Sequence, residues 1–244
     1  MSIPEDLKKW RKARREALIA RRVAIPEAER NAANARMTAA LVDAFTPPAE
    51  TVVGFCWPFK NELDARFAVR HWREAGAHGA LPEVTAPRTP LTFRLWKPGV
   101  PMRAGVYDIP VPDGTPVVLP DIAIVPMNGF DGRGYRLGYG GGFFDRTLAA
   151  LERRIVAIGI AFDALRMETI HPQPHDIPMD FVVTESAIYA ASGEPLEAVD
   201  AAEAKKRYER LLLAKRLPRA AFPDTGLSSP VCYADQFPDY FGKA

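Results

Sequence analysis

A glycine-rich stretch, residues 128–146, lies between an apolar run and a segment with helical spacing. The apolar run at residues 117–126 is typical of a buried strand, and residues 143–153 place apolar side chains at helical intervals. Glycine lets main-chain N–H groups turn toward an anion, and the start of a helix adds a partial positive charge. The order strand, loop, helix therefore predicts an α/β protein with a phosphate-type site in this loop.

Generic nucleotide motifs do not describe the loop, because it lacks Gly-Lys-Ser/Thr and its glycines are too crowded for a dinucleotide fingerprint. The run Arg-Leu-Gly-Tyr-Gly-Gly-Gly-Phe-Phe-Asp-Arg at residues 136–146 closely resembles the signature of the 5-formyltetrahydrofolate cyclo-ligase family. Further segments resemble that family in the same order: residues 54–62, 81–82, 91–96, 105–110 and 120–126. The resemblance covers roughly residues 5 to 190.

Alternating apolar and helical patterns predict the fold class. Helices are expected at residues 5–22, 26–45, 61–74 and 143–153, and strands at 51–57, 78–84, 117–125, 155–162 and 180–184. This order predicts a three-layer α/β domain with an open, mostly parallel sheet. The family resemblance implies the fold of ribose-5-phosphate isomerase and the CoA transferases. We expect a domain at residues 1–190 and a C-terminal extension at 191–244, helix-prone at first and then rich in proline and aromatics.

Charge and composition indicate a soluble cytoplasmic protein. The 32 basic and 30 acidic side chains leave a net charge of +2, so no overall field favours nucleic acid or an acidic membrane. No apolar window reaches the roughly twenty residues that span a bilayer, and no secretory signal is recognisable. Two cysteines are too few for a disulfide framework. We expect a monomer or a weak homo-oligomer.

The resemblance implies an ATP- and Mg²⁺-dependent ligase. In that reaction the formyl oxygen on N5 of 5-formyltetrahydrofolate is phosphorylated, N10 attacks the activated carbon, and phosphate leaves to give 5,10-methenyltetrahydrofolate. Such chemistry depends on positioned N–H groups, cations and magnesium more than on covalent catalysis. Serine and cysteine nucleophile motifs are absent from the sequence, which argues against an acyl-enzyme hydrolase.

The resemblance assigns ATP to the glycine-rich loop and to basic residues of the first helix. The candidate ATP-binding residues are Arg11, Arg15, Arg136, Leu137, Gly138, Tyr139, Gly140, Gly141, Gly142, Phe143 and Phe144. Arg11 and Arg15 lie four residues apart and so share one helix face, although Lys8 and Lys12 also fit the same role.

The loop departs from the family at several positions. Family members commonly carry tyrosines at the positions of Phe143 and Phe144, and some carry lysine at Gly141 and arginine at Tyr139. Arg133, Arg136 or Arg146 can compensate for the missing cations.

Two aspartates are candidate magnesium ligands. The resemblance assigns Asp145 and a second aspartate that we place at Asp180, with Asp176 as the competing choice. Magnesium commonly takes one or two carboxylates together with phosphate oxygens and water. An aspartate in the first turn of a helix is also an ordinary partner for the helix dipole. The four histidines, His71, His78, His171 and His175, do not match zinc-site spacing.

Substrate-binding residues are expected after the first strand. Glu62 matches the family glutamate that contacts folate, and a carboxylate can accept two hydrogen bonds from the pterin N–H donors. Open α/β sheets place ligands in such strand-to-helix loops. The alternative is a glutamate that only favours a helix dipole, an interpretation that fits Asp64 even better. Trp57 and Phe143 complete the predicted substrate-binding set, within a flat aromatic pocket.

Two rival functions remain open at this point. The first is a non-catalytic folate- or nucleotide-binding module, favoured by the loss of the two hydroxyls at Phe143 and Phe144. The second is an RNA-associated module, suggested by the basic first helix but disfavoured by the near-neutral overall charge.

Overall fold

A computed structural model describes residues 5–151, 155–191 and 195–215. In this part of the chain, nine strands form one central sheet. Their order is β14 (Glu197–Val199), β13 (Ile188–Ala190), β12 (Phe181–Val183), β10 (Val156–Ile160), β7 (Ile122–Pro126), β1 (Val52–Gly54), β2 (His78–Glu83), β3 (Thr92–Trp96) and β6 (Val117–Val118). The five central strands, from β12 to β2, run parallel, and the two strands at each edge pair antiparallel. The predicted mixed α/β fold with a mostly parallel core is confirmed.

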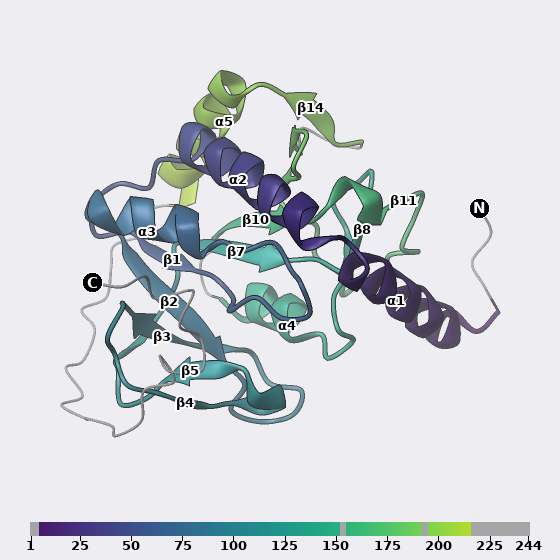
Figure 1. Cartoon of the computed structure of the whole chain (residues 1–244), viewed down its shortest axis with the longest axis horizontal. Helices are drawn as coiled ribbons and strands as arrows, with labels where there is room; N and C mark the ends of the chain where they lie inside the picture. The colour runs from purple at the N-terminus through teal and green to yellow at the C-terminus, as the bar shows by residue number, and fades with distance from the viewer. Residues whose placement is uncertain (1–4, 152–154, 192–194, 216–244) are drawn as a thin grey trace.

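Helices cover both faces of the sheet (Figure 1). On one face lie α2 (Glu27–Ala44), α3 (Arg66–Glu74) and α5 (Ala201–Lys215), and on the other lies α4 (Phe143–Ala150). Alternate residues of β7 divide between these layers, because Ile122 and Ile124 join the larger core whereas Ala123 and Val125 pack toward α4. The first helix, α1 (Leu7–Val23), lies beyond the sheet beside η2 (Asp163–Leu165).

Smaller elements complete the described chain. The hairpin β4 (Met102–Ala104) and β5 (Pro110–Pro112) is separate from the central sheet, and η1 (Val106–Asp108) forms its tip. A three-stranded sheet of β11 (Arg166–Met167), β8 (Gly129–Asp131) and β9 (Arg136–Leu137) leads into the glycine-rich loop. The sequence pattern did not predict these short strands, because each is too short to show a period.

Two predicted elements have different boundaries. The strand expected at residues 117–125 is two strands, the edge strand β6 and the central strand β7, and Pro120 lies between them. Proline cannot donate a ladder hydrogen bond, so the chain leaves one strand and enters another. The helix expected from residue 61 begins at Arg66, where the Asp64 carboxylate accepts a hydrogen bond from the Arg66 main-chain N–H at 3.0 Å.

Residues after 190 also contact the domain. Strand β14 extends the sheet, and α5 packs against α2, with Tyr208 fully buried against Phe45 at a ring-centroid distance of 5.4 Å. The extension that we expect from residue 191 therefore begins with elements that share the domain core. Its proline- and aromatic-rich part, residues 218–244, lies outside the described residues. Among the helices that are described, none is long and apolar enough to cross a membrane.

Candidate active site

The site lies where the sheet topology reverses. From β1 the chain moves to β2 on one side, and from β7 it moves to β10 on the other, although β1 and β7 are parallel neighbours. Open α/β sheets bind ligands outside the carboxyl ends of the strands at such a switch point. Glu62 follows β1 and Asn128 follows β7, so both side chains come after the carboxyl ends of these two neighbouring strands.

Glu62 lies in the loop before α3 and is buried, with 6% of the residue exposed. Its Oε1 accepts a hydrogen bond from the Tyr139 hydroxyl at 2.8 Å, and its Oε2 accepts one from the Phe59 main-chain N–H at 3.1 Å. The prediction that Glu62 follows the first strand holds, but the residue is not in a helical first turn. The helix-dipole interpretation of Glu62 is therefore wrong, whereas Asp64 pairs with Arg66 at 2.6 Å beside the helix start.

Arg22, at the end of α1, is the functional-site residue that sequence reasoning missed. Its side chain is 1% exposed and lies 3.7 Å from Glu62 Oε1. It donates to the Asn128 side-chain oxygen at 2.6 Å and to the Tyr139 hydroxyl at 2.8 Å. A basic residue in a helix rich in basic residues carries no signal of its own, so only burial identifies Arg22.

Burial is the largest influence on the pKa values of the ionisable groups around Glu62 that are shifted upward. Burial raises the pKa of Glu62, while the charge of Arg22 and the hydrogen bonds from Tyr139 and Phe59 oppose that rise. Burial and the nearby charge of Glu62 raise the pKa of the Cys56 thiol well above its ordinary value. The same two causes raise the pKa of Tyr139, which keeps its hydroxyl protonated as a donor. Glu62 therefore lies in a low-dielectric environment, and its carboxyl group is an acceptor for ligand N–H groups.

The aromatic candidates have different surroundings. Trp57 is buried in the main core, and the Arg66 guanidinium lies 4.4 Å from the centroid of its ring. Phe144, in the first turn of α4, packs against the two smaller hydrophobic clusters. Phe143 lies over the loop, because a Cβ built on Gly141 would meet its ring at 2.6 Å. Their assignments to ATP and substrate stay predictions.

The glycine-rich loop has several features that are typical of an anion-binding site. Gly140 and Gly142 have φ values of +93° and +64°, in the left-handed region that other residues rarely adopt. Within the described residues, the main-chain N–H groups of residues 139–142 donate no hydrogen bond to another residue. Arg15 reaches the loop from α1 and donates to the Gly138 carbonyl at 2.6 Å. The loop therefore combines free donors, a cation and the start of α4.

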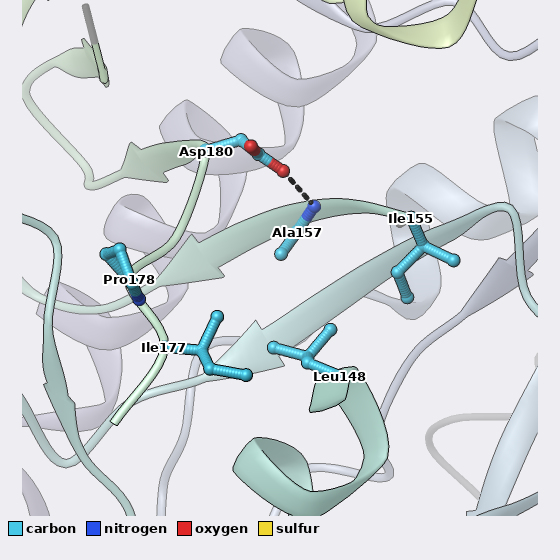
Figure 2. Close-up of a pocket in the computed structure, with 6 residues that line it drawn as sticks. All are labelled: Leu148, Ile155, Ala157, Ile177, Pro178 and Asp180. Carbon is cyan, nitrogen blue, oxygen red and sulfur yellow. Dashed lines mark hydrogen bonds between the residues drawn. The ribbon is translucent and has the colours of Figure 1, made fainter. Parts of the chain in front are cut away.

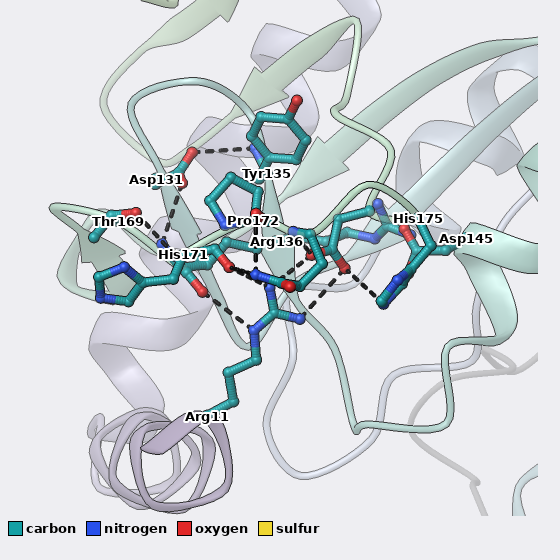
Figure 3. Close-up of polar contacts among 12 residues, drawn as sticks. Arg11, Asp131, Tyr135, Arg136, Asp145, Thr169, His171, Pro172 and His175 are labelled. Atoms are coloured by element: carbon teal, nitrogen blue, oxygen red, sulfur yellow. Dashed lines mark hydrogen bonds and ion pairs between the residues drawn. The ribbon is translucent and has the colours of Figure 1, made fainter. Parts of the chain in front are cut away.

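Charged side chains gather beside this loop (Figure 3). Arg136 is buried; its guanidinium lies 3.0 Å from Asp145 Oδ1 and donates to the Ile177 carbonyl at 2.7 Å. Burial lowers the pKa of Arg136, and the charges of Asp145 and Asp176 oppose that change. Arg11 donates to Asp176 Oδ2 at 2.6 Å. Arg11, Arg136, Asp145 and Asp176 thus form one cluster, although the sequence separates them widely.

Asp180 has a different environment from Asp145. It is 6% exposed, and its Oδ2 accepts a hydrogen bond from the main-chain N–H of Ala157 in β10 at 2.8 Å. It lines a mostly apolar cavity of about 220 Å³ on the α4 side of the sheet (Figure 2). The residues that line this cavity are Leu148, Ile155, Ala157, Ile177, Pro178 and Asp180. The hydrogen bond from Ala157 holds the Asp180 carboxylate against β10.

The described residues contain no group of three or more His, Cys, Asp and Glu side chains that could hold a metal ion. A magnesium ion that shares its coordination with phosphate needs only one or two protein carboxylates. Asp145 and Asp176 act on the same buried arginine, whereas Asp180 bonds to Ala157. Both Asp176 oxygens accept hydrogen bonds from Arg11, and the magnesium assignments stay predictions.

Comparison with known proteins gives a consistent result. Residues 7–185 match the model of the 5-formyltetrahydrofolate cyclo-ligase family. The chain is 31% identical over 177 residues to the 5-formyltetrahydrofolate cyclo-ligase of Escherichia coli K12, covering 69% of this chain and 96% of that protein. It is 28% identical to the enzyme of the same name from Mycolicibacterium smegmatis, over 70% of this chain and 91% of that protein.

Solved structures show the same fold. The 5,10-methenyltetrahydrofolate synthetase of Aquifex aeolicus superposes with a TM-score of 0.64 at 24% identity, covering 77% of this chain and 96% of that one. The synthetase of Mycoplasma pneumoniae superposes with a TM-score of 0.60 at 23% identity, covering 72% of this chain and 98% of that one.

Proposed function

Because the chain belongs to the 5-formyltetrahydrofolate cyclo-ligase family, a family of ligases, we propose that it makes 5,10-methenyltetrahydrofolate from 5-formyltetrahydrofolate with ATP and Mg²⁺. The observation that carries the proposal is the Tyr139 contact, which joins the glycine-rich loop to the buried Glu62 at the switch point of the sheet. A phosphate-type loop and a ring-recognition carboxylate are thereby parts of a single site.

The phosphate end binds ATP in this proposal. The free N–H groups of residues 139–142 and the start of α4 receive phosphate oxygens, and Arg15 adds a cation next to Gly140. Arg15 is better placed for this role than Arg11, because Arg11 already holds Asp176 and the carbonyls of Ile170 and His171. The remaining loop residues and Arg136 shape and support this end.

Asp145 and Asp176 would hold magnesium. Asp145 retains 21% side-chain exposure, and the contacts to Ile177 N and to Arg136 both involve its Oδ1, which leaves Oδ2 available. When bound, Mg²⁺ supplies positive charge that stabilises the phosphate oxygens during transfer. Asp180, predicted as the second ligand, is the weaker candidate because its hydrogen bond to β10 and its burial keep it within the fold.

The ring end binds the folate. Glu62 accepts hydrogen bonds from pterin N–H groups, and its burial strengthens those bonds. With both substrates in place, the formyl oxygen attacks the γ-phosphorus and ADP leaves. N10 then attacks the formyl carbon and loses its proton, and the C–O bond to phosphate breaks. The chain orients the reactants and stabilises charge, and no residue forms a covalent bond.

A direct assay tests the proposal. Purified protein is mixed with 5-formyltetrahydrofolate, ATP and Mg²⁺, and the near-ultraviolet absorbance of the methenyl product is followed, with ATP or Mg²⁺ omitted as controls. We expect product only in the complete mixture. Folded protein that binds ATP or folate but forms no product would instead indicate the non-catalytic binding module.

A further inference from the structure

Arg22 lies at the opposite end of α1 from Arg11, the predicted phosphate residue that holds Asp176. Eleven residues separate the two positions, which corresponds to about 16 Å along a helix with a rise of about 1.5 Å per residue. The buried Arg22 guanidinium contacts three separate chain segments. A buried arginine with this many partners is costly to desolvate, so its position is a defined feature of the site.

The loop that presents Glu62 is conformationally strained. Lys60 and Asn61, the two residues before Glu62, have φ values of +50° and +59°. Each non-glycine residue in this region costs about 1 kcal/mol or more, so the surrounding structure must hold the loop.

Arg22 supplies much of that support. Its Nε donates to the Lys60 carbonyl at 2.9 Å, and a terminal nitrogen donates to the Phe59 carbonyl at 3.3 Å. The Asn61 side chain donates to the carbonyl of Val23, the residue after Arg22, at 3.2 Å. The end of α1 therefore holds this loop at Phe59 and at both strained residues.

We infer that Arg22 is a positioning residue for substrate recognition: it holds the loop at residues 59–62 and the Tyr139 hydroxyl so that the Glu62 carboxylate faces the folate ring. This inference rests on the proposed function. Arg22 meets the glycine-rich loop through the Tyr139 hydroxyl, away from the main-chain N–H groups assigned to phosphate, and its effect on the folate passes through Glu62. The same helix thus serves both halves of the site, with Arg15 at the loop and Arg22 at the pocket.

A dependence on pH follows from the same contacts. The groups that face Glu62 are Arg22 from α1, Tyr139 from the glycine-rich loop and Cys56 from the segment after β1. The charge of Arg22 is the largest influence that opposes the burial-induced rise in the pKa of Glu62. Removing that charge raises the pKa further, so the ionised acceptor is lost as pH falls toward the new value.

The test compares Arg22→Gln with Arg21→Gln, a matched control one residue away whose side chain is exposed. We expect Arg22→Gln to raise the KM for 5-formyltetrahydrofolate at least about tenfold, the size expected when a charged group loses a hydrogen-bonding partner. The KM for ATP should stay within about twofold of the control. As pH is lowered, the folate KM of Arg22→Gln should also begin to rise at a higher pH than that of the control.

Two further variants separate positioning from general stability. Arg22→Lys keeps the buried charge but cannot reach all the carbonyl partners, so we expect an intermediate folate KM. This variant replaces Arg22→Gln in the test if the glutamine variant does not fold. Lys60→Gly removes strain at a positive φ, so adding it to the Arg22 variants should lower their raised folate KM. In the otherwise natural protein, Lys60→Gly should change the folate KM little.

The outcomes distinguish the inference from the proposed function. If the natural protein makes product and Arg22→Gln keeps the folate KM of the control, the inference fails while the function stands. Parallel rises in both KM values, unrelieved by Lys60→Gly, would show a merely structural role and also overturn it. Absence of product from the natural protein would instead count against the proposed function.

Discussion

The two ends of the candidate site are built in opposite ways. At the Glu62 end the Glu62 and Arg22 side chains are buried 3.7 Å apart, and the exposed Tyr139 side chain hydrogen-bonds to both of them. At the glycine-rich loop the main-chain donors at residues 139–142 have no partner within the described residues, and two glycines have positive φ. For the proposed function, the difference means that the acceptor for the folate ring is arranged before a ligand arrives, whereas the proposed phosphate end has main-chain donors that a ligand would satisfy.

This contrast fits the chemistry of the two proposed ligands. A pterin ring offers a few directional N–H groups, which need an acceptor in a set orientation. A triphosphate offers many oxygens and strong negative charge, for which free N–H groups and an arginine suffice. We therefore expect the Glu62 end of the site to be rigid and the glycine-rich loop to adapt to its ligand.

The largest effect is expected from removing the pocket acceptor. Glu62→Gln or Glu62→Ala should lower kcat/KM for 5-formyltetrahydrofolate roughly ten- to a hundredfold, because a charged acceptor of ligand hydrogen bonds is lost. The KM for ATP should change little. Steady-state kinetics with each substrate varied in turn measure both values. Glu83→Gln, at a glutamate that pairs with Arg94 and Arg103 on other strands, is the control. A normal folate KM in the Glu62 variants would remove this residue from the pterin role.

The next effect concerns the acids of the phosphate end. Asp145→Asn and Asp176→Asn should each raise the Mg²⁺ concentration for half-maximal turnover about tenfold, since each removes one candidate carboxylate ligand. Asp180→Asn should leave that concentration unchanged and lower the melting temperature instead, because Asp180 is buried against β10. Magnesium titrations and thermal unfolding are measured together. Unchanged magnesium dependence in Asp145→Asn would exclude Asp145 as a ligand. A tenfold rise in the half-maximal Mg²⁺ concentration of Asp180→Asn would favour Asp180 as the second ligand.

A smaller effect tests the loop backbone. Gly140→Ala and Gly142→Ala should raise the KM for ATP about five- to thirtyfold, because alanine in the left-handed region costs roughly 1–2 kcal/mol. Gly138→Ala is the matched control, since its φ is not in that region and a Cβ there would meet nothing within 4 Å. The folate KM should be nearly constant in all three variants. Equal ATP KM values for Gly138→Ala and Gly140→Ala would show that the backbone conformation is unimportant.

The smallest effect contrasts two buried glutamates by the pH dependence of stability. For Glu62 burial raises the pKa above the ordinary 4.5, so the folded state holds the proton more tightly. Stability then falls as pH rises from 4.5 toward the folded-state pKa. For Glu83 burial acts in the same direction, but hydrogen bonds from Arg94 and Arg103 outweigh it and lower the pKa. Its contribution is present above pH 4.5 and is lost as pH falls through the folded-state value.

Urea unfolding of the natural protein and of the Glu62→Gln and Glu83→Gln variants, measured from pH 4 to pH 8, checks these signs. As pH rises, the free energy of unfolding of the natural protein should fall relative to Glu62→Gln and should rise relative to Glu83→Gln. The same sign for both comparisons would contradict the opposite environments described for the two carboxyl groups.

The family signature made part of the site predictable. Residues 136–146 are contiguous, so the glycines and Asp145 in the first helical turn are local features that the pattern contains. Glu62 was also predictable, because it follows a strand and matches a family motif. Its loop was not, since the helix was expected to begin at residue 61 and actually begins at Arg66, after two residues with positive φ.

Other choices depended on contacts between distant segments. Asp176 and Asp180 are four residues apart and equivalent by composition, yet one pairs with Arg11 and the other bonds to Ala157. Pro120 ends an apolar run that looked continuous, and only strand pairing shows that the two halves occupy an edge and the centre of the sheet.

The sequence by itself determined the α/β class, the family and the phosphate-type loop, because periodicity and a contiguous signature are written in neighbouring residues. Only the tertiary structure decided which arginine is buried. Arg21 and Arg22 are adjacent and chemically identical, but Arg22 meets Lys60, Asn128 and Tyr139, which lie 38, 106 and 117 positions further along the chain. Burial and hydrogen bonding across such separations arise when the strands of the sheet bring their ends together, and no local pattern records them.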